Sequence, residues 1–182
     1  MKYIYLIPVF IMGLSKLNAQ EVILNKENPI KEIVKGTHYK TEKKILEKFE
    51  GVWVFRKGDE IFKIQISTDK FYNKLLDVYT DMLIGSCCYN QVEKDCHLNI
   101  EEQQLSCEST NQDLEQGFSY FMFLDTKDHK LGKAKLEILE NGTARWTLKN
   151  RGGVIINDNK ADGTKWKEGF SVPTNVILTK VK

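Results

Sequence analysis

Residues 133–149 contain the stretch that decides the fold: Lys133-Ala134-Lys135-Leu136-Glu137-Ile138 and, after Asn141-Gly142, Thr143-Ala144-Arg145-Trp146-Thr147-Leu148-Lys149. Charged or polar residues alternate with apolar ones on both sides of Asn141-Gly142, which is the spacing of a half-buried strand. Asn-Gly is the strongest short hairpin signal, because both residues tolerate the positive φ of a type I′ turn. The stretch therefore predicts two antiparallel strands.

Runs of the same kind continue on both sides of this hairpin. The predicted strands are 51–56, 60–68, 77–88, 96–105, 118–124, 133–138, 143–149 and 175–181. A short helix is expected over 41–49, with Thr41 as its N-cap. Because the turns are mostly short and strands do not alternate with helices, we predict an all-β fold. An antiparallel up-and-down eight-stranded barrel leaves no exposed sheet edge, and a β-sandwich is the alternative.

The chain is predicted to have three parts. Residues 1–19 are a signal peptide, in which Lys2 precedes an uncharged run from Tyr3 to Leu14 that is too short for a membrane span. Residues 20–40 are a loosely ordered lead-in, and residues 41–182 are the barrel domain. We expect cleavage between Ala19 and Gln20, a periplasmic or secreted location, and no stable membrane insertion afterwards.

The charge balance argues against nucleic acid as a partner. Residues 1–19 contain Lys2 and Lys16 and no acid, so the 27 basic residues of the chain become 25, against 25 acidic ones. The densest basic segment, 40–48, is interleaved with glutamates. Nucleic-acid binding needs a basic stripe that neutralises phosphates, and this sequence does not supply one.

Gly51-Val52-Trp53 opens the first barrel strand directly after the short helix, and here the chain resembles the lipocalin and wider calycin families. The resemblance implies that Gly51, Trp53 and Lys180 close one end of the barrel, with Lys180 in the place where lipocalins usually have arginine. The chain is also similar to an uncharacterised lipocalin-like family of exported proteins from Bacteroidota. The features shared with it are Asn18-Ala19-Gln20, Phe62-x-Ile64-x-Ile66, Leu83-Ile84-Gly85 and the ending 173–180.

Two functional hypotheses follow from this fold and compartment. The first is an exported, non-enzymatic lipocalin-like protein that binds a small apolar ligand inside the barrel, lined by Trp53, Phe62, Ile64, Tyr120 and Trp146. The alternative is an exported structural or interaction module whose core is filled by these side chains. Such a module would recognise a protein or envelope component through its loops, of which 150–173, with Trp166, is the longest.

The four cysteines, Cys87, Cys88, Cys96 and Cys107, lie close together in the sequence. In an exported protein an even cysteine count favours two disulfides over a zinc site, and the Cys-x₂-Cys pair typical of zinc is missing. Adjacent cysteines seldom bridge each other, which leaves two connectivities. We favour Cys88 with Cys96 and Cys87 with Cys107, because a hairpin would bring Cys88 opposite Cys96.

No motif predicts catalysis, a metal site or a cofactor. The histidines, His38, His97 and His129, are expected on the surface, because none lies in a nucleophile or metal-ligand motif. Asp77 and Asp81 would share one face of a strand, where paired carboxylates could act as acid and base, but a solvent-exposed face is the simpler interpretation. An enzyme therefore remains a third hypothesis, which needs residues that converge only in the fold.

Overall fold

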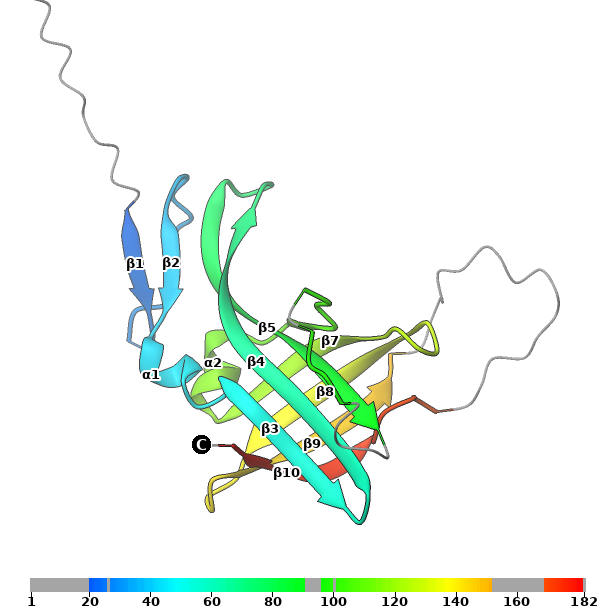
Figure 1. The fold of residues 1–182 in the computed structure, drawn as a ribbon. Coiled ribbons are helices and arrows are strands. Elements are labelled where there is room, and N and C mark those ends of the chain that lie inside the picture. Colours follow the sequence, from blue (N-terminus) through cyan, green and yellow to red (C-terminus); the bar gives the residue numbers. More distant parts are fainter. Residues whose placement is uncertain (1–19, 26, 91–95, 100, 152–168, 182) are drawn as a thin grey trace, which may run out of the picture.

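A computed structural model describes residues 20–25, 27–90, 96–99, 101–151 and 169–181. The predicted signal peptide, 1–19, and Trp166 lie outside the described residues. Within these ranges the chain forms a closed, all-antiparallel barrel with two short helices and a two-stranded extension (Figure 1). None of the helices in the described ranges has the length and apolar character needed to cross a membrane.

The barrel is an up-and-down meander of eight strands, as the alternating sequence predicts, and it is consistent with a lipocalin-like fold. Its strands are β3 (Gly51–Lys57), β4 (Glu60–Asn73), β5 (Val78–Asn90), β6 (Leu105–Cys107), β7 (Phe118–Asp125), β8 (Lys130–Ile138), β9 (Thr143–Asn150) and β10 (Asn175–Lys180). Each strand pairs with its neighbour in the sequence, and β10 returns to pair with β3.

Two of the strand junctions are narrow. The β4–β5 hairpin is paired along all 13 residues of β5. In contrast, β5 pairs with β6 only at Ile84 and Gly85, and β10 pairs with β3 only at Thr179 and Lys180. The barrel therefore consists of two broadly paired meanders, β3–β5 and β7–β10, which are joined by the β10–β3 seam on one side and by the three-residue strand β6 on the other.

The lead-in contains two strands that the sequence analysis did not predict. β1 (Glu21–Leu24) and β2 (His38–Thr41) run parallel to each other, and β2 runs parallel to the first part of β5. Figure 1 shows this extension beside the end of the β4–β5 hairpin that projects from the barrel. The expectation of a loosely ordered segment was wrong for these residues, because their pairing depends on contacts with β5 that are distant in sequence.

Three local expectations also needed correction. Residues 96–99 and 101–104 are not a strand, since Cys96 is held on the outside of the barrel and β6 begins only at Leu105. The first helix, α1 (Lys43–Leu46), is shorter than predicted, and its N-cap is Glu42 because Thr41 ends β2. A second helix, α2 (Asn111–Glu115), was not predicted.

Two layers of apolar side chains stabilise the barrel. The main core fills its interior with aromatic and aliphatic side chains from the barrel strands, together with Ile45 and Leu46 of α1 and Leu114 of α2. A smaller cluster lies on the outer face of β3–β5, where Val54 and Ile61 pack against Cys96. Both sides of β3–β5 are therefore covered by apolar contacts.

Candidate functional site

The barrel interior is packed with side chains. Trp53, Phe62, Ile64 and Trp146, four of the five predicted ligand residues, are buried in the main core. The ring of Trp146 lies 5.7 Å from that of Phe62 and 6.2 Å from that of Phe123, centroid to centroid. These contacts are those of a filled core, and the groove described below is lined by other residues.

Tyr120, the fifth predicted ligand residue, faces outward, so its predicted inward orientation was wrong. The inward residues of β7 are Ser119, Phe121, Phe123 and Asp125. Residues 118–124 are apolar on both faces, so alternation alone could not decide which face is inside. On the outer face, the amine of Lys133 lies 4.5 Å from the centre of the Tyr120 ring and covers it.

Gly51, Trp53 and Lys180 lie together at the α1 end of the barrel. Lys180 is paired with Trp53 across the β10–β3 seam, and its Nζ lies 5.3 Å from the centre of the Trp53 ring. The amine donates to the carbonyl oxygen of Glu47 at 2.9 Å, and Trp53 Nε1 donates to that of Phe49 at 2.8 Å. Gly51 has a φ of 112° and a Cβ there would lie 3.1 Å from Lys180 Cε, so a side chain would be both strained and crowded.

The opposite end of the barrel is closed by residues 169–173. The buried carboxylate of Asp125 accepts hydrogen bonds of 2.6 Å from both the backbone N–H and the hydroxyl of Ser171. Lys130 Nζ donates to the Gly169 carbonyl oxygen at 2.7 Å, and Trp146 Nε1 donates to that of Pro173 at 2.9 Å. Side-chain hydrogen bonds thus join the barrel strands to the segments that cover both ends of the barrel.

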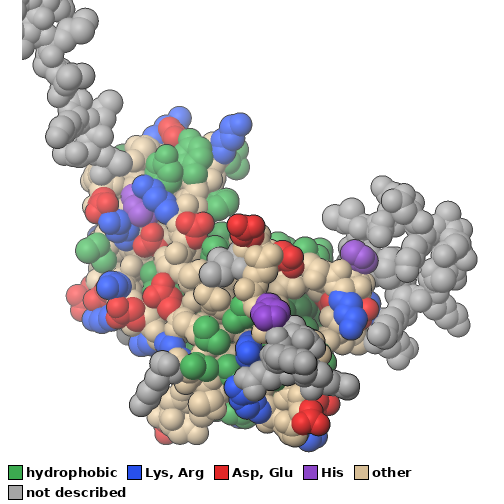
Figure 2. All heavy atoms as spheres, in the orientation of Figure 1, with side chains coloured by type: hydrophobic (Ala, Val, Ile, Leu, Met, Phe, Trp, Pro, Cys, Tyr) green, Lys and Arg blue, Asp and Glu red, His purple; other side chains and the backbone are tan. Residues whose placement is uncertain are grey.

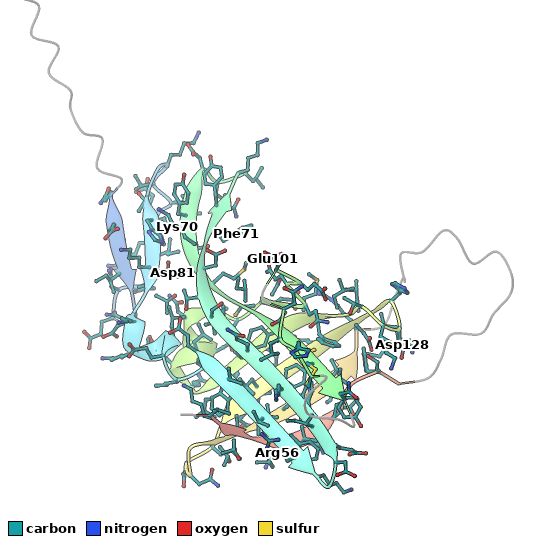
Figure 3. All side chains as sticks on the ribbon, viewed as in Figure 1. Arg56, Lys70, Phe71, Asp81, Glu101 and Asp128 are labelled. Atoms are coloured by element: carbon teal, nitrogen blue, oxygen red, sulfur yellow. A yellow bond between two sulfur atoms is a disulfide. The ribbon has the colours of Figure 1, made fainter. Side chains whose placement is uncertain are left out.

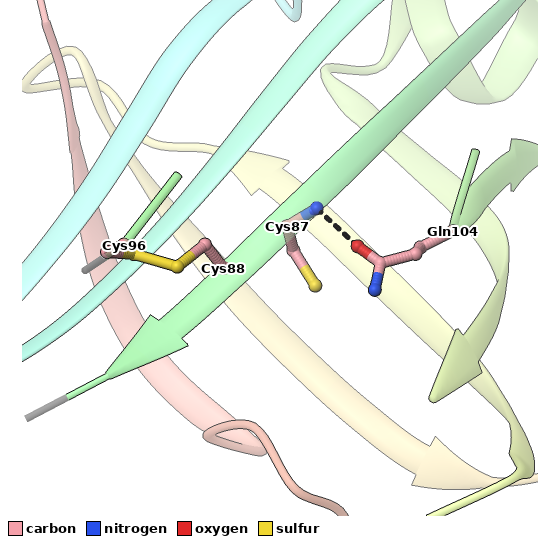
Figure 4. Close-up of a disulfide and its surroundings, with 4 residues drawn as sticks. All are labelled: Cys87, Cys88, Cys96 and Gln104. Atoms are coloured by element: carbon pink, nitrogen blue, oxygen red, sulfur yellow. Dashed lines mark hydrogen bonds between the residues drawn. A yellow bond between two sulfur atoms is a disulfide. The ribbon is translucent and has the colours of Figure 1, made fainter. Parts of the chain in front are cut away.

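The structure contains one of the two favoured disulfides. Cys88 and Cys96 are bonded on the outside of the barrel, with Cα atoms 5.5 Å apart (Figure 4). Cys87 and Cys107 are free. The predicted Cys87–Cys107 bridge was wrong because of the strand register. Ile84 pairs with Ser106, so Cys107 falls level with Leu83, four residues from Cys87. That offset is about 13 Å, too far for a disulfide.

Cys87 points into the barrel, and its backbone N–H donates to the side-chain oxygen of Gln104 at 2.7 Å (Figure 4). Burial, reinforced by the nearby Asp125 carboxylate, raises the pKa of its thiol to about 12. The thiol is therefore protonated at neutral pH and a poor nucleophile.

Across the ranges that the structure covers, no group of three or more histidine, cysteine or acidic side chains is arranged to hold a metal ion.

Replacing both Cys88 and Cys96 by serine should lower the free energy of unfolding by about 2.5 kcal/mol, the loop-closure value for so short a loop. Chemical denaturation in the absence of reductant measures this loss. The intact oxidised protein should weigh two hydrogens less than the reduced protein, as one disulfide requires. Cys107→Ser is the control and should leave the mass difference unchanged. A difference of four hydrogens would contradict the structure.

A groove of about 930 Å³ lies on the side of the barrel, between the β1–β2 extension and α2. Its floor is the β5 segment from Thr80 to Leu83. One wall is formed by β1, β2 and the loop after β1, and the other by α2 and the residues before it. Thr41 of β2 donates its hydroxyl hydrogen to the Asn111 side-chain oxygen of α2 at 2.9 Å, which ties the walls together.

Helix α2 positions several polar groups of the groove. Thr110 and Asp113 form a capping box: the Asp113 backbone N–H donates to the Thr110 hydroxyl, and the Asp113 carboxylate accepts from the Thr110 backbone N–H. Leu114 anchors the helix in the main core. The Thr-x-x-Asp spacing is a helix-start signal that could have revealed α2 in the sequence.

His38 and Asp81 form a buried pair beside the groove. Their Nε2 and Oδ1 atoms lie 2.8 Å apart, and the two side chains are 7% and 15% exposed. The pair joins β2 to β5, and Asp81 also lines the groove (Figure 3). The expectation that His38 is solvent-exposed was wrong, because β2 pairs with β5 and buries it. His97 and His129 are exposed.

Asp77 and Asp81 do not act as a pair of carboxylates. Asp77 lies in the turn before β5 at a φ of 54° and accepts a hydrogen bond of 2.8 Å from the Tyr72 hydroxyl, whereas Asp81 faces His38. Among the described side chains, Asp81 is the sole hydrogen-bond partner of the His38 ring. No nucleophile is therefore bonded to this histidine in the described part of the chain.

The groove combines two kinds of surface. Apolar side chains, including Leu24, Tyr39 and Leu83, lie beside hydroxyl and amide groups, including Thr80 and Asn111. Its volume is within the range of small-molecule sites, and such a lining suits a ligand with an apolar part and a hydrogen-bonding part. The sequence analysis missed this site because its parts come from three segments that are distant in sequence.

No curated protein and no solved structure matches this chain. A family of unknown function, DUF6705, matches residues 1–97 and 88–181. These two overlapping segments include every described residue. The protein therefore belongs to the DUF6705 family of unknown function.

Proposed function

We propose that this protein is an exported, non-enzymatic binding protein of lipocalin-like fold that takes a small amphipathic ligand in the groove beside α2. The observation that carries the proposal is the combination of a packed barrel interior with an open groove of about 930 Å³. Lipocalin-like barrels can bind ligands inside, but here Trp53, Phe62 and Trp146 occupy that space. The filled-core hypothesis is therefore better supported than the interior ligand.

Export is supported by the Cys88–Cys96 disulfide together with the predicted signal peptide. Disulfides persist in oxidising compartments and are rare in the cytosol. Cys88 and Cys96 are eight residues apart and lie on the outer face of the barrel, where their sulfurs contribute to an apolar cluster. The bridge is therefore part of the folded wall, which fits a periplasmic or secreted protein.

The chemistry of the ligand follows from the groove. Within the described residues, Asp81 is bonded through Oδ1 to His38, which leaves its other carboxylate oxygen for a donor on the ligand. Leu83 and Leu114 connect the groove to the main core and offer an apolar contact. A ligand with a hydrogen-bond donor at one end and an aliphatic or aromatic part at the other would match both features.

The proposal is tested by screening a library of amphipathic fragments against the isotope-labelled protein by NMR. Hits should shift the backbone signals of residues 80–83 and 111–115. Met82→Trp, which places a larger side chain in the groove, should abolish these shifts by steric exclusion. Met122→Trp on the outer face of β7 is the matched control and should leave them unchanged. Shifts centred on Ile64 and Trp146 would overturn the proposal in favour of a ligand inside the barrel, and a library without hits would also count against it.

A further inference from the structure

Exposed apolar side chains gather at the free end of the extension, far from the closed ends of the barrel. Two loops meet there, 33–36 and 73–77, and the Gly36 backbone N–H donates to the Asp77 carbonyl oxygen at 2.7 Å. We call their exposed apolar residues the apical patch: Ile33, Val34, Phe71, Tyr72, Leu75 and Leu76. Figure 2 shows hydrophobic side chains at this upper end, with basic and some acidic side chains beside them.

Leu75 is the most exposed member of the patch, at 92%. The turn that carries it is built by hydrogen bonds, because the Asn73 side-chain oxygen accepts from the backbone N–H groups of both Leu75 and Leu76 at 3.1 Å. The bond from the Tyr72 hydroxyl to Asp77 fixes the other side of the turn. A turn built in this way presents its leucine to the surroundings, and contiguous exposed apolar patches mark interaction sites.

The charges around the patch indicate the partner. Lys35, Lys70 and Lys74 are exposed on the same two loops and on the adjoining part of β4. Exposed carboxylates lie among these lysines, because Glu32 precedes Ile33 and Asp69 precedes Lys70. Asp77 accepts the Tyr72 hydroxyl. Residues 31–36 and 69–77 together contain four lysines and three acids, so a small excess of positive charge surrounds the patch. Lys70 and Phe71 point to opposite sides of the hairpin (Figure 3). An apolar apex with an excess of lysines over acids around it is complementary to a bilayer that carries anionic headgroups.

The path of the chain also places the apical patch toward the membrane that the protein is proposed to have crossed. β1 begins at this end of the molecule (Figure 1), where the Gln20 carbonyl oxygen accepts a hydrogen bond of 2.8 Å from the His38 backbone N–H. The predicted signal peptide, 1–19, joins the folded chain at Gln20. A chain that has just crossed a membrane therefore has the apical patch on the side where its signal peptide is attached.

We propose that the apical patch docks this protein reversibly on the surface of a bilayer containing anionic phospholipid. Leu75 and Leu76 enter the boundary between headgroups and acyl chains. Lys35 and Lys74 contact lipid phosphates, whereas the amine of Lys70 lies 4.2 Å from the centre of the Tyr79 ring. This contact is peripheral, so it differs from the stable membrane insertion that the sequence analysis did not expect. It does not involve the groove, and its test is independent of the proposed ligand.

Co-sedimentation with vesicles tests the proposal, using the chain from Gln20 onward, which contains every described residue. Binding is compared between vesicles of phosphatidylcholine alone and vesicles that also contain phosphatidylglycerol. The double variant Leu75→Ser, Leu76→Ser keeps the net charge and should reduce partition onto the anionic vesicles by about tenfold, because two apolar side chains lose their lipid contact. Leu124→Ser is the matched control at another exposed leucine, 41% exposed on β7, and should bind like the wild type.

A separate variant tests the contribution of the lysines to membrane binding. Lys74→Gln should weaken partition by about fivefold, the effect of one lysine near an anionic surface. Raised salt should weaken wild-type binding in the same way. The proposal would be overturned if the wild-type protein bound neither kind of vesicle. It would also be overturned if the double leucine variant bound anionic vesicles like the wild type. A concentration-dependent dimer that is lost in the double variant, without vesicle binding, would also overturn it by assigning the patch to a second copy.

Discussion

Gly85→Ala should lower the free energy of unfolding by about 3 kcal/mol, which corresponds to roughly 6–12 °C in melting temperature for a domain of this size. Gly85 lies in β5 at the β5–β6 seam and faces the interior of the barrel. It is paired with Ile66 of β4 and with Leu105 of β6. A Cβ at this position would overlap the backbone carbonyl oxygen of Gln65 and lie 3.2 Å from a methyl group of Leu105. The carbonyl cannot move without distorting the β4–β5 ladder, so the clash is costly.

Gly142→Ala is the control for this variant. Gly142 lies in the β8–β9 turn at a φ of 78°, and a Cβ there would have no neighbour within 4 Å. Its replacement measures the backbone cost of alanine at positive φ alone, about 1 kcal/mol. Denaturant unfolding of both variants gives the comparison. Equal losses would mean that β4 and β5 do not need their close approach at Gly85.

Trp146→Ala should lower the free energy of unfolding by about 3–5 kcal/mol, which is the usual effect of truncating a large aromatic residue in a packed core. Its ring is fully buried against Phe62 and Phe123, so alanine would leave a cavity that the surrounding strands cannot fill. The variant also loses the hydrogen bond from the indole N–H to Pro173, which holds the closing segment 169–173. Thermal unfolding measures the loss.

The same variant tests whether the interior is filled. If the cavity is as isolated as the packing implies, added indole should occupy it and restore part of the melting temperature, since a ligand that binds only the folded state stabilises it. Trp146→Phe is the control, because it retains an aromatic ring and leaves less space. If the free energy of unfolding of Trp146→Ala were within about 1 kcal/mol of the wild-type value, the barrel interior would be loosely packed. That result would revive the hypothesis of an interior ligand.

Local alternation made most of the barrel predictable. The hairpin around Asn141-Gly142 and the regular pattern of 60–68 each specify strand, face and partner from adjacent residues. The extension was missed because β1 and β2 are only four residues long, and because β2, which holds β1, pairs in parallel with β5, a strand far along the chain. The orientation of Tyr120 failed for another reason: Ser119 and Asp125 are polar yet inward, each satisfied by a partner that only the fold supplies.

The candidate site was less predictable than the barrel. Cysteine spacing was sufficient for Cys88–Cys96, because these cysteines are only eight residues apart, but Cys87 and Cys107 depend on the β5–β6 register. The His38–Asp81 pair joins residues 43 positions apart on two parallel strands. A pattern of neighbouring residues contains no information about such a contact. The groove beside this pair was therefore visible only in the folded chain.

The two short seams also determine the order in which the barrel can be assembled. Hairpins such as β4–β5 and β8–β9 pair residues that are close in sequence, so they close at little entropic cost. The β10–β3 seam joins the two ends of the barrel sequence through Thr179 and Lys180, and it must wait until almost the whole chain is available. A chain delivered N-terminus first thus holds β3–β5 as an open, three-stranded sheet until β10 arrives. During that interval the Cys88–Cys96 bridge can already fix the outer side of this sheet, while its apolar inner side stays uncovered and depends on rapid completion of the remaining strands.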